Sequence, residues 1–420
     1  MKAQAGTGQE LGDDRLSPRE KIKRQIEVRA QRHLETPRRH NADTIREKTM
    51  TKDTTGGLDR RKFLSGAVGV AGLSAMQITI PGTAFAQSYP MRPITLVVMY
   101  AAGGGTDTIM RKLAEEMAAA KGWTINVANR PGAVGGVATQ FVTAARPDGY
   151  TLLGGANYNR FVRVLGHAEF TPWEDWVTMK AANALASWSV RNDSPFQTME
   201  DAIAAAKANP GSVSISTSGT GGVWHELALI IANMAGMELK YVPYKGGKPA
   251  TLAGLQGETD IAGGGLHEHI DLIRAGELRN LTQTGVDDIT LADGKVLRSI
   301  ASIVPESRSL LPVGATYNFM MRRDLPPEIL QELADGFRTA ANSAGFTEMV
   351  NSKFFQLDIK IGEEADREAA LMETVTTDIF NRFQDQIGAE VKTAAELGLP
   401  APEDFDTWWP PQGYTPAPIK

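Results

Sequence analysis

The feature that most constrains the fold of this chain is a repeated alternation of short apolar segments with amphipathic ones. Residues 94–100 form a continuous apolar run rich in β-branched side chains, which is typical of a buried parallel strand. Apolar residues at helical spacing follow in 108–121, and the pattern continues with a strand at 125–128, a helix at 137–145 and a strand at 150–153. This β-α-β-α-β order predicts a parallel sheet with right-handed crossovers.

The same alternation returns after residue 193 and predicts a second α/β lobe. Its predicted helices are 198–208, 224–234, 250–255 and 268–274, and its predicted strands are 213–216, 239–242 and 259–262. From about Leu325 the chain becomes mostly helical, with helices starting at Pro326 and spanning 366–387. We expect these helices to return to the first lobe, and the Pro- and Trp-rich residues 400–420 to form an extended tail that packs on the surface through its aromatic side chains.

Charge divides the chain into a basic leader and an acidic body. Residues 1–86 carry 16 basic and 10 acidic side chains, which leaves 28 basic and 39 acidic ones for residues 87–420. The net charge of −5 argues against a nucleic-acid binder, which normally shows a basic footprint. The chain has no Cys, which excludes disulfides, thiolate metal sites and a cysteine nucleophile.

The leader has the features of an export signal. Arg60 and Arg61 precede an uncharged stretch, 63–86, that ends in the small-x-small cleavage pattern Ala84-Phe85-Ala86. The arginine pair resembles the twin-arginine signal, so we expect passage through the twin-arginine translocase, cleavage after Ala86 and a periplasmic location. A membrane anchor is the alternative, but the stretch is weakly hydrophobic and contains a helix-breaking Pro-Gly pair.

Residues 1–49 are charged and hold few large apolar side chains, so they do not predict a core. Met50 lies shortly before the arginine pair, where an export signal of ordinary length would begin. We therefore expect translation to start at Met50 rather than at Met1.

Glycine-rich loops follow three of the predicted strands, at residues 101–107, 217–222 and 263–267, and each leads into a helix. Ligands of parallel α/β sheets bind at this end of the strands, where helix N-termini offer free N–H groups. A single such loop is as well explained by a tight turn, but three in two lobes favour a site for a small anion. No nucleotide-binding or nucleophile-elbow motif accompanies them.

Several short motifs in order resemble the periplasmic receptors of tripartite tricarboxylate transporters, also called Bug receptors. The resemblance covers about residues 88–390. The motifs are Tyr89-Pro90-Met91-Arg92-Pro93-Ile94, residues 101–107, Asn129-Arg130-Pro131-Gly132-Ala133, residues 147–153, Ser218-Gly219-Thr220-Gly221 with His225, and Val242-Pro243-Tyr244-Lys245-Gly246.

The resemblance implies an α/β fold of the two-lobed periplasmic-binding-protein type (type II-like), with a ligand cleft between the lobes. Carried onto this chain, it assigns residues 87–191 and 315–399 to lobe 1, residues 192–314 to lobe 2 and residues 400–420 to an added tail. The chain should cross between the lobes near residues 190–194 and 312–316.

The family's ligands are mostly carboxylates, and the resemblance implies that backbone amides of two loops hold the ligand carboxylate. The residues that carry this expectation here are Ala102, Gly103, Gly104, Gly105, Thr106 and Asp107 in the first loop, and Ser218, Gly219, Thr220 and Gly221 in the second. Further expected ligand-binding residues are Tyr100, Asn157, His225, Tyr244 and Gly264.

Each candidate also has a structural alternative. Asp107 could cap its helix, Asn157 could serve a turn, and His225 could simply pack. The tripeptide His267-Glu268-His269 invites a metal site, but no third ligand is evident in the sequence. We expect no catalytic residues, no metal and no cofactor.

The sequence thus predicts an exported receptor that captures a small organic anion: a di- or tricarboxylate, an acidic amino acid or an aromatic acid. It would close its cleft on the ligand and deliver it to membrane permease subunits. Two alternatives stay open: an exported enzyme, hydrolase-like, that uses the same cleft, and a sensor that reports its ligand to a membrane kinase.

Overall fold

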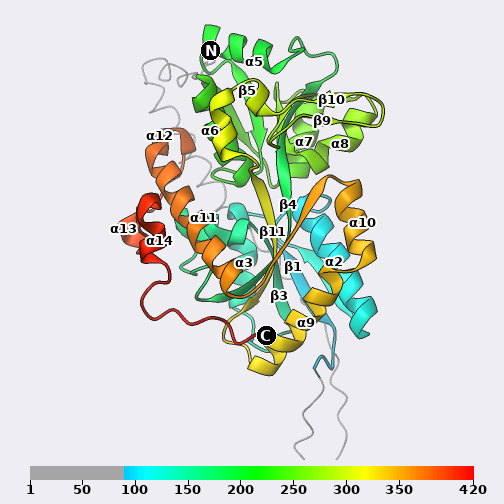
Figure 1. The fold of residues 1–420 in the computed structure, drawn as a ribbon, viewed down its shortest axis with the longest axis vertical. Coiled ribbons are helices and arrows are strands. Elements are labelled where there is room, and N and C mark those ends of the chain that lie inside the picture. Colours follow the sequence, from blue (N-terminus) through cyan, green and yellow to red (C-terminus); the bar gives the residue numbers. More distant parts are fainter. Residues whose placement is uncertain (1–88) are drawn as a thin grey trace, which may run out of the picture. The chain divides into compact units, whose positions relative to one another are not determined.

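The computed structural model describes residues 89–420 (Figure 1). The predicted leader, residues 1–86, with its arginine pair and cleavage site, lies outside the described residues. Within 89–420, no helix combines the length and apolar character needed to span a membrane.

The first lobe is built on one mixed sheet with the order β12-β4-β11-β3-β1-β2. Its strands are β1 Ile94–Val98, β2 Ile125–Asn129, β3 Thr151–Ala156, β4 Trp176–Arg191, β11 Gly314–Arg322 and β12 Phe355–Lys360. β1 pairs in parallel with β2 and β3, as the sequence predicts, and β11 joins β3 and β4 in antiparallel register. Strands from the two ends of the chain therefore complete a single sheet.

Helices cover this sheet and bury one continuous apolar core. The main helices of this part are α2 Gly105–Lys121, α3 Gly136–Thr143, α4 Arg160–Val164, α9 Pro327–Ala341, α10 Ala344–Ser352 and α11 Glu363–Arg382. In α2 the predicted stripe of Ile109, Leu113 and Met117 is fully buried, and Gly122 ends the helix with the left-handed φ of 70° that glycine tolerates.

The second lobe contains four helices and short strands. They are α5 Met199–Ala208, β5 Val213–Thr217, α6 Val223–Ala235, β6 Leu239–Pro243, α7 Gly247–Gln256, β7 Ala262–Gly265, α8 Leu266–Arg274, β8 Leu278–Gln283, β9 Ile289–Thr290 and β10 Val296–Leu297. β5 and β6 are parallel, while β7 and β8 pair with β4. A capping box, in which Thr198 and Asp201 bond each other's backbone N–H, starts α5.

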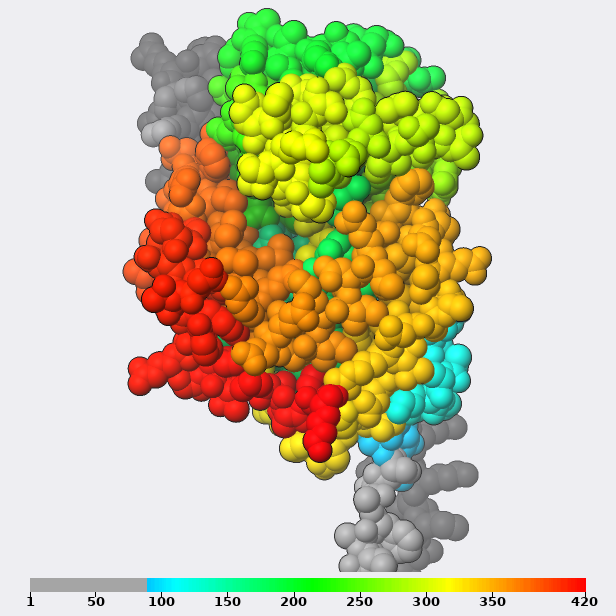
Figure 2. All heavy atoms as spheres, in the orientation of Figure 1, coloured from blue at the N-terminus to red at the C-terminus, as the bar shows by residue number. Residues whose placement is uncertain are grey.

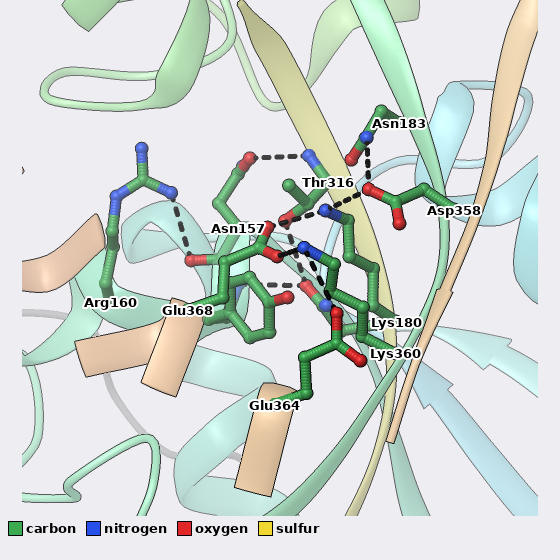
Figure 3. A network of polar contacts seen from close by, with 11 residues as sticks. Asn157, Arg160, Lys180, Asn183, Thr316, Asp358, Lys360, Glu364 and Glu368 are labelled. Atoms are coloured by element: carbon green, nitrogen blue, oxygen red, sulfur yellow. Dashed lines mark hydrogen bonds and ion pairs between the residues drawn. The ribbon is translucent and has the colours of Figure 1, made fainter. Parts of the chain in front are cut away.

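The long strand β4 joins the two lobes (Figure 1). Its first part pairs with β11 and β12, and from Ala186 onward it pairs with β7 and β8. The change of partners at Leu185–Ala186 lies earlier than the crossing predicted near residues 190–194, whereas Gly314, which starts β11, lies within the second predicted crossing. Buried Lys180 fixes β4 through ion pairs with Asp358 (2.6 Å) and Glu368 (2.5 Å) (Figure 3).

Two local predictions were wrong. The strand expected at 259–262 lies at 262–265, so Gly264 is part of β7, opposite Ser187, and not of a loop. This strand needs glycine at its second position, because a Cβ on Gly263 would lie 2.4 Å from the Ser216 carbonyl oxygen. The helix expected from residue 108 starts at Gly105, so the glycine-rich segment forms its first turn.

The C-terminal segment is more than an extended tail. Short helices occur at α12 Gln384–Ile387, α13 Ala394–Leu397 and α14 Phe405–Trp408. Phe405 is buried, and Trp408 and Trp409 pack against the core of the first lobe. Tyr414 donates to Asp366 on α11 (2.8 Å), and the red segment lies against the orange helix in Figure 2. Its aromatic side chains therefore fasten this segment to lobe 1.

Candidate functional site

A small cavity lies where both lobes contribute helix N-termini and strand ends. It is partly open, and the space between its atoms is about 310 Å³ when the open solvent at its mouth is counted. Its lining residues are Tyr100, Gly104, Gly105, Thr106, Ala156, Asn157, Ser218, Val223, Trp224, Gly247, Glu268, Ala315 and Tyr317.

Three polar side chains of this lining are buried and have no hydrogen-bond partner within residues 89–420. They are the Tyr100 hydroxyl, the Asn157 Nδ2 amide and the Ser218 hydroxyl. Buried polar groups are normally paired, and leaving one unpaired costs about 1–3 kcal/mol. All three can donate, so a ligand with acceptor oxygens would satisfy them.

The orientation of Asn157 is set by its neighbours. It follows β3 with a left-handed φ of 55°, a conformation that Asn adopts more readily than most residues. Its Oδ1 accepts from the backbone N–H of Thr316 on β11 (3.1 Å), which leaves the Nδ2 donor free (Figure 3). The backbone carbonyl of Asn157 in turn accepts from Arg160 (3.2 Å).

The N-termini of α2 and α6 also reach the cavity. Gly104 and Gly222 supply no capping side chain; at the start of α2 the Gly105 N–H instead faces the Glu268 carboxylate, which it stabilises. A Cβ on Gly105 would lie 2.2 Å from the Tyr317 hydroxyl and 2.3 Å from His267 Nε2. Only glycine fits at this close approach of the two lobes.

Asp107 supports the first loop from behind and does not line the cavity. Its carboxylate accepts from the Gly103 N–H (2.9 Å) and from Asn129 Nδ2 (2.8 Å), and it pairs with Arg111 (2.9 Å). Burial works against ionisation of Asp107, but the hydrogen bonds from Arg111, Gly103 and Asn129 outweigh it and hold the pKa below its usual value. Asp107 thus fixes the loop that presents Gly104, Gly105 and Thr106.

His225 and Tyr244 do not line the cavity either. His225 Nδ1 accepts from the Gly221 N–H (3.0 Å), and burial lowers the pKa of the ring to about 4, so it is neutral. The Tyr244 hydroxyl donates to Glu258 at an exposed position (2.7 Å). The other predicted residues outside the lining are Ala102, Gly103, Gly219, Thr220, Gly221 and Gly264.

The sequence missed seven lining residues: Ala156, Val223, Trp224, Gly247, Glu268, Ala315 and Tyr317. Val223 and Trp224 directly follow the predicted loop 217–222, and Gly247 directly follows the motif at 242–246. Both predicted segments therefore ended one or two residues too early. Ala315 and Tyr317 gave no local signal, because the pairing of β11 with β3 and β4 brings them to the cavity.

Glu268 is the acidic residue of the lining. Its side chain is 3% exposed, and Oε2 accepts from the Gly265 N–H (2.9 Å). The carboxylate fills the space beside two glycines. A Cβ on Gly247 would lie 2.0 Å from its Oε2, and a Cβ on Gly104 would lie 3.2 Å from its Oε1. Burial raises the pKa of Glu268 to about 7, although backbone N–H groups including that of Gly265 oppose the shift.

The neighbouring histidines have separate surroundings. His267 stacks on Phe355 with 4.3 Å between ring centroids, and His269 Nδ1 lies 3.0 Å from the hydroxyls of Ser187 and Ser189. Burial lowers the pKa of both rings. Among residues 89–420, no group of three potential metal ligands comes together.

A buried ion pair connects the lobes next to the cavity. Arg160 on α4 lies 2.7 Å from Glu226 on α6, and both side chains are at most 5% exposed. Thr376 on α11 accepts from Arg160 Nε (2.6 Å) and donates to Glu226. We refer to Arg160, Glu226 and Thr376 as the clasp.

Comparison with known proteins gives a consistent family. A family model described as "Tripartite tricarboxylate transporter family receptor" matches residues 109–375. A relative from Bordetella pertussis, named as a UPF0065 protein, is 30% identical over 320 residues, which are 76% of this chain and 93% of the relative.

Solved structures share the two-lobed fold. MatC from Rhodopseudomonas palustris, solved with bound malate, superposes with a TM-score of 0.60 at 21% identity, covering 71% of this chain and 100% of MatC. Another R. palustris protein, solved with adipate, gives a TM-score of 0.61 at 23% identity, covering 74% of this chain and 99% of that protein. The predicted fold class is confirmed.

Proposed function

This chain belongs to the tripartite tricarboxylate transporter family of receptors, and we propose that it captures a small organic carboxylate and delivers it to membrane permease subunits. Proteins of this family bind substrates as receptors and are not enzymes, which removes the exported enzyme considered above. The observation that carries the proposal is the convergence of three unpaired buried donors, on Tyr100, Asn157 and Ser218, in one cavity.

A carboxylate suits these donors because its two oxygens accept several hydrogen bonds. The first turn of α6, with Val223 and Trp224, adds N–H groups and the positive end of a helix dipole, and Gly104, Gly105 and Thr106 line the cavity from α2. The two similar R. palustris proteins were solved with malate and adipate, which are small carboxylates. The predicted residues outside the lining would shape these loops, with Tyr244 and Gly264 at the margin; they are Ala102, Gly103, Asp107, Gly219, Thr220, Gly221 and His225.

We propose lobe 1 at residues 87–191 and 315–399 and lobe 2 at residues 192–314, with the ligand held where they meet; within these bounds, residues 186–191 of β4 already pair with β7 and β8 of lobe 2. Rotation of the lobes about β4 and β11 would open the cavity, and a bound ligand would favour the closed form because it contacts both. The predicted twin-arginine leader and the family both support a periplasmic site of action.

The proposal is tested by thermal unfolding of the purified protein against succinate, malate, adipate, citrate, amino acids and aromatic acids. A ligand at 100 times its dissociation constant adds about 2.7 kcal/mol of stability, which raises the melting temperature by several degrees. If no compound of the panel shifts the melting temperature of folded, ligand-free protein, the carboxylate receptor is wrong.

Asn157→Asp sharpens this test. Asp keeps the acceptor for the Thr316 N–H but replaces the free donor with a negative oxygen. We expect the affinity for the responding carboxylate to fall about tenfold or more, measured by calorimetry. Ser352→Ala, at the exposed end of α10, is the control and should bind like the unmodified protein. Uptake by cells with and without the permease then separates transport from sensing.

A further inference from the structure

The lining of the cavity combines hydrogen-bond donors with one acidic side chain. The donors are the unpaired groups of Tyr100, Asn157 and Ser218. The acid is Glu268, whose carboxylate lies beside Gly104 and Gly247. A ligand with a carboxylate at each end matches the donors and is repelled by the acid.

Glu268 lacks a cationic partner within residues 89–420. His267 Nε2 lies 3.7 Å from Oε1, but burial keeps this ring neutral. The other titratable or charged groups around Glu268 are His269 on its own helix, Lys248 on α7 and Tyr317 on β11. Lys248 favours the ionised form of Glu268 through its charge, yet it forms no ion pair with it among the described residues. A buried carboxylate in this position gains strongly from a cation brought by the ligand.

Glu268 accepts hydrogen bonds from neutral groups instead of forming an ion pair. The donors are the Gly265 N–H (2.9 Å), the Gly105 N–H and the side chain of Trp224. These donors hold the carboxylate but leave its charge uncompensated, so a cationic nitrogen suits it better than a second carboxylate.

We propose that Glu268 determines specificity and that the cavity takes an aminocarboxylate, with its ammonium group against Glu268 and its carboxylate against Tyr100, Asn157 and Ser218. This inference rests on the proposed function and narrows the ligand class. A dicarboxylate would have to bring a second negative charge against Glu268 in a nearly dry site, which only protonation of one of the two groups relieves.

The test compares matched ligands of similar length on the full protein. The pairs are 4-aminobutyrate with succinate and 6-aminohexanoate with adipate, supplemented by the common α-amino acids and malate. We expect one or more aminocarboxylates to raise the melting temperature more than any dicarboxylate. In Glu268→Gln the affinity for the responding aminocarboxylate should fall about 10- to 100-fold. Glu277→Gln, at an exposed position just after the same helix and without an ion pair among the described residues, is the control.

Proton linkage gives a second readout that does not depend on a variant. Binding of an ammonium group favours ionised Glu268, so it releases protons near pH 7 and strengthens as the pH rises from about 6 to about 8. Dicarboxylate binding would take protons up and weaken over the same range. Calorimetry in two buffers of different ionisation enthalpy measures the sign directly.

The outcomes separate this inference from the proposed function. Preferential binding of a dicarboxylate, with proton uptake or with affinity undiminished in Glu268→Gln, would overturn the role of Glu268 and leave the carboxylate receptor standing. Failure of every carboxylate, with or without an amine, would overturn both. Preferential binding of an aminocarboxylate with proton release supports both.

Discussion

Two buried glutamates of the second lobe, Glu226 and Glu268, occupy similar places and have different partners. Each lies in the first turn of a helix that faces lobe 1, and each is less than 10% exposed. Glu226 meets Arg160 and Thr376, whereas Glu268 meets backbone N–H groups and a neutral histidine. The comparison teaches that burial alone does not define a role: the charge of Glu226 is balanced within the protein, whereas Glu268 has no cationic partner among the described residues.

The largest expected effect is on the clasp. Glu226→Ala leaves the Arg160 guanidinium buried without its counter-charge, which costs about 3–5 kcal/mol in the closed form. The protein can relieve this cost by separating the lobes, so we expect a lower melting temperature and a larger radius of gyration in small-angle X-ray scattering. Both are measured without ligand.

The double variant Arg160→Met with Glu226→Leu is the matched control for the clasp. It removes both charges together, so it should recover much of the stability lost in the single variant. A single variant that melts within about 1 °C of the unmodified protein and stays equally compact would show that the pair does not hold the lobes.

Glu268 should make stability depend on pH. Its pKa is raised from 4.5 to about 7, so between these values the folded form holds a proton that the unfolded chain has lost. Stability is therefore fully present below about pH 4.5 and decreases as the pH rises toward 7, by at most about 1.4 kcal/mol per pH unit and roughly 3 kcal/mol in total.

Denaturant unfolding at a series of pH values measures this slope. Glu268→Gln cannot ionise, so its stability should decrease less steeply over the same range. Equal slopes for the two proteins would mean that Glu268 titrates as it does in water, and the contrast with Glu226 would then lose its physical basis.

Gly105→Ala tests the close contact of the lobes at the cavity. The added Cβ collides with the Tyr317 hydroxyl and His267, which we expect to cost about 1–3 kcal/mol and to abolish ligand binding by displacing the first turn of α2. Ala119→Gly, on the exposed side of the same helix, costs about 0.5–1 kcal/mol and should leave binding intact. Binding by Gly105→Ala at unchanged affinity would place the ligand elsewhere.

The smallest effect is expected in the C-terminal segment, where Asp366 resembles Glu226 in having both an arginine and a hydroxyl partner. Arg323 lies 2.5 Å from Asp366, and the Tyr414 hydroxyl donates to it. Tyr414→Phe keeps the ring against Trp409 and removes one hydrogen bond, so the free energy of unfolding should fall by about 0.5–1.5 kcal/mol. A larger loss would indicate that the hydroxyl orders the whole segment.

The sequence predicted the lining residues that directly follow strands recognisable from the local pattern of apolar residues. Tyr100, Thr106, Asn157 and Ser218 were found because strand ends and glycine-rich loops mark the ligand edge of a parallel sheet. Tyr317 was missed because its place depends on antiparallel pairing with a strand far away in the chain. Such long-range pairing leaves no periodic trace near the residue itself.

Glu268 and β4 were harder to predict for different reasons. Glu268 lies between two histidines, and its role depends on which cations surround it in space, which the sequence does not report. β4 is rich in Ala and carries Lys180 and Asn183 within a buried strand, so neither strand propensity nor alternation identifies it. Both polar residues are satisfied by distant acids, above all Asp358.

The order of strands in the large sheet has a consequence for how the chain is made. β1, β2 and β3 are synthesised early, but the strand that covers the edge of β3 is β11, which starts only at Gly314. While the whole second lobe emerges from the ribosome, that edge has no partner from its own sheet. An uncovered strand edge is a template for aggregation, so protection of the nascent chain should matter most during this interval.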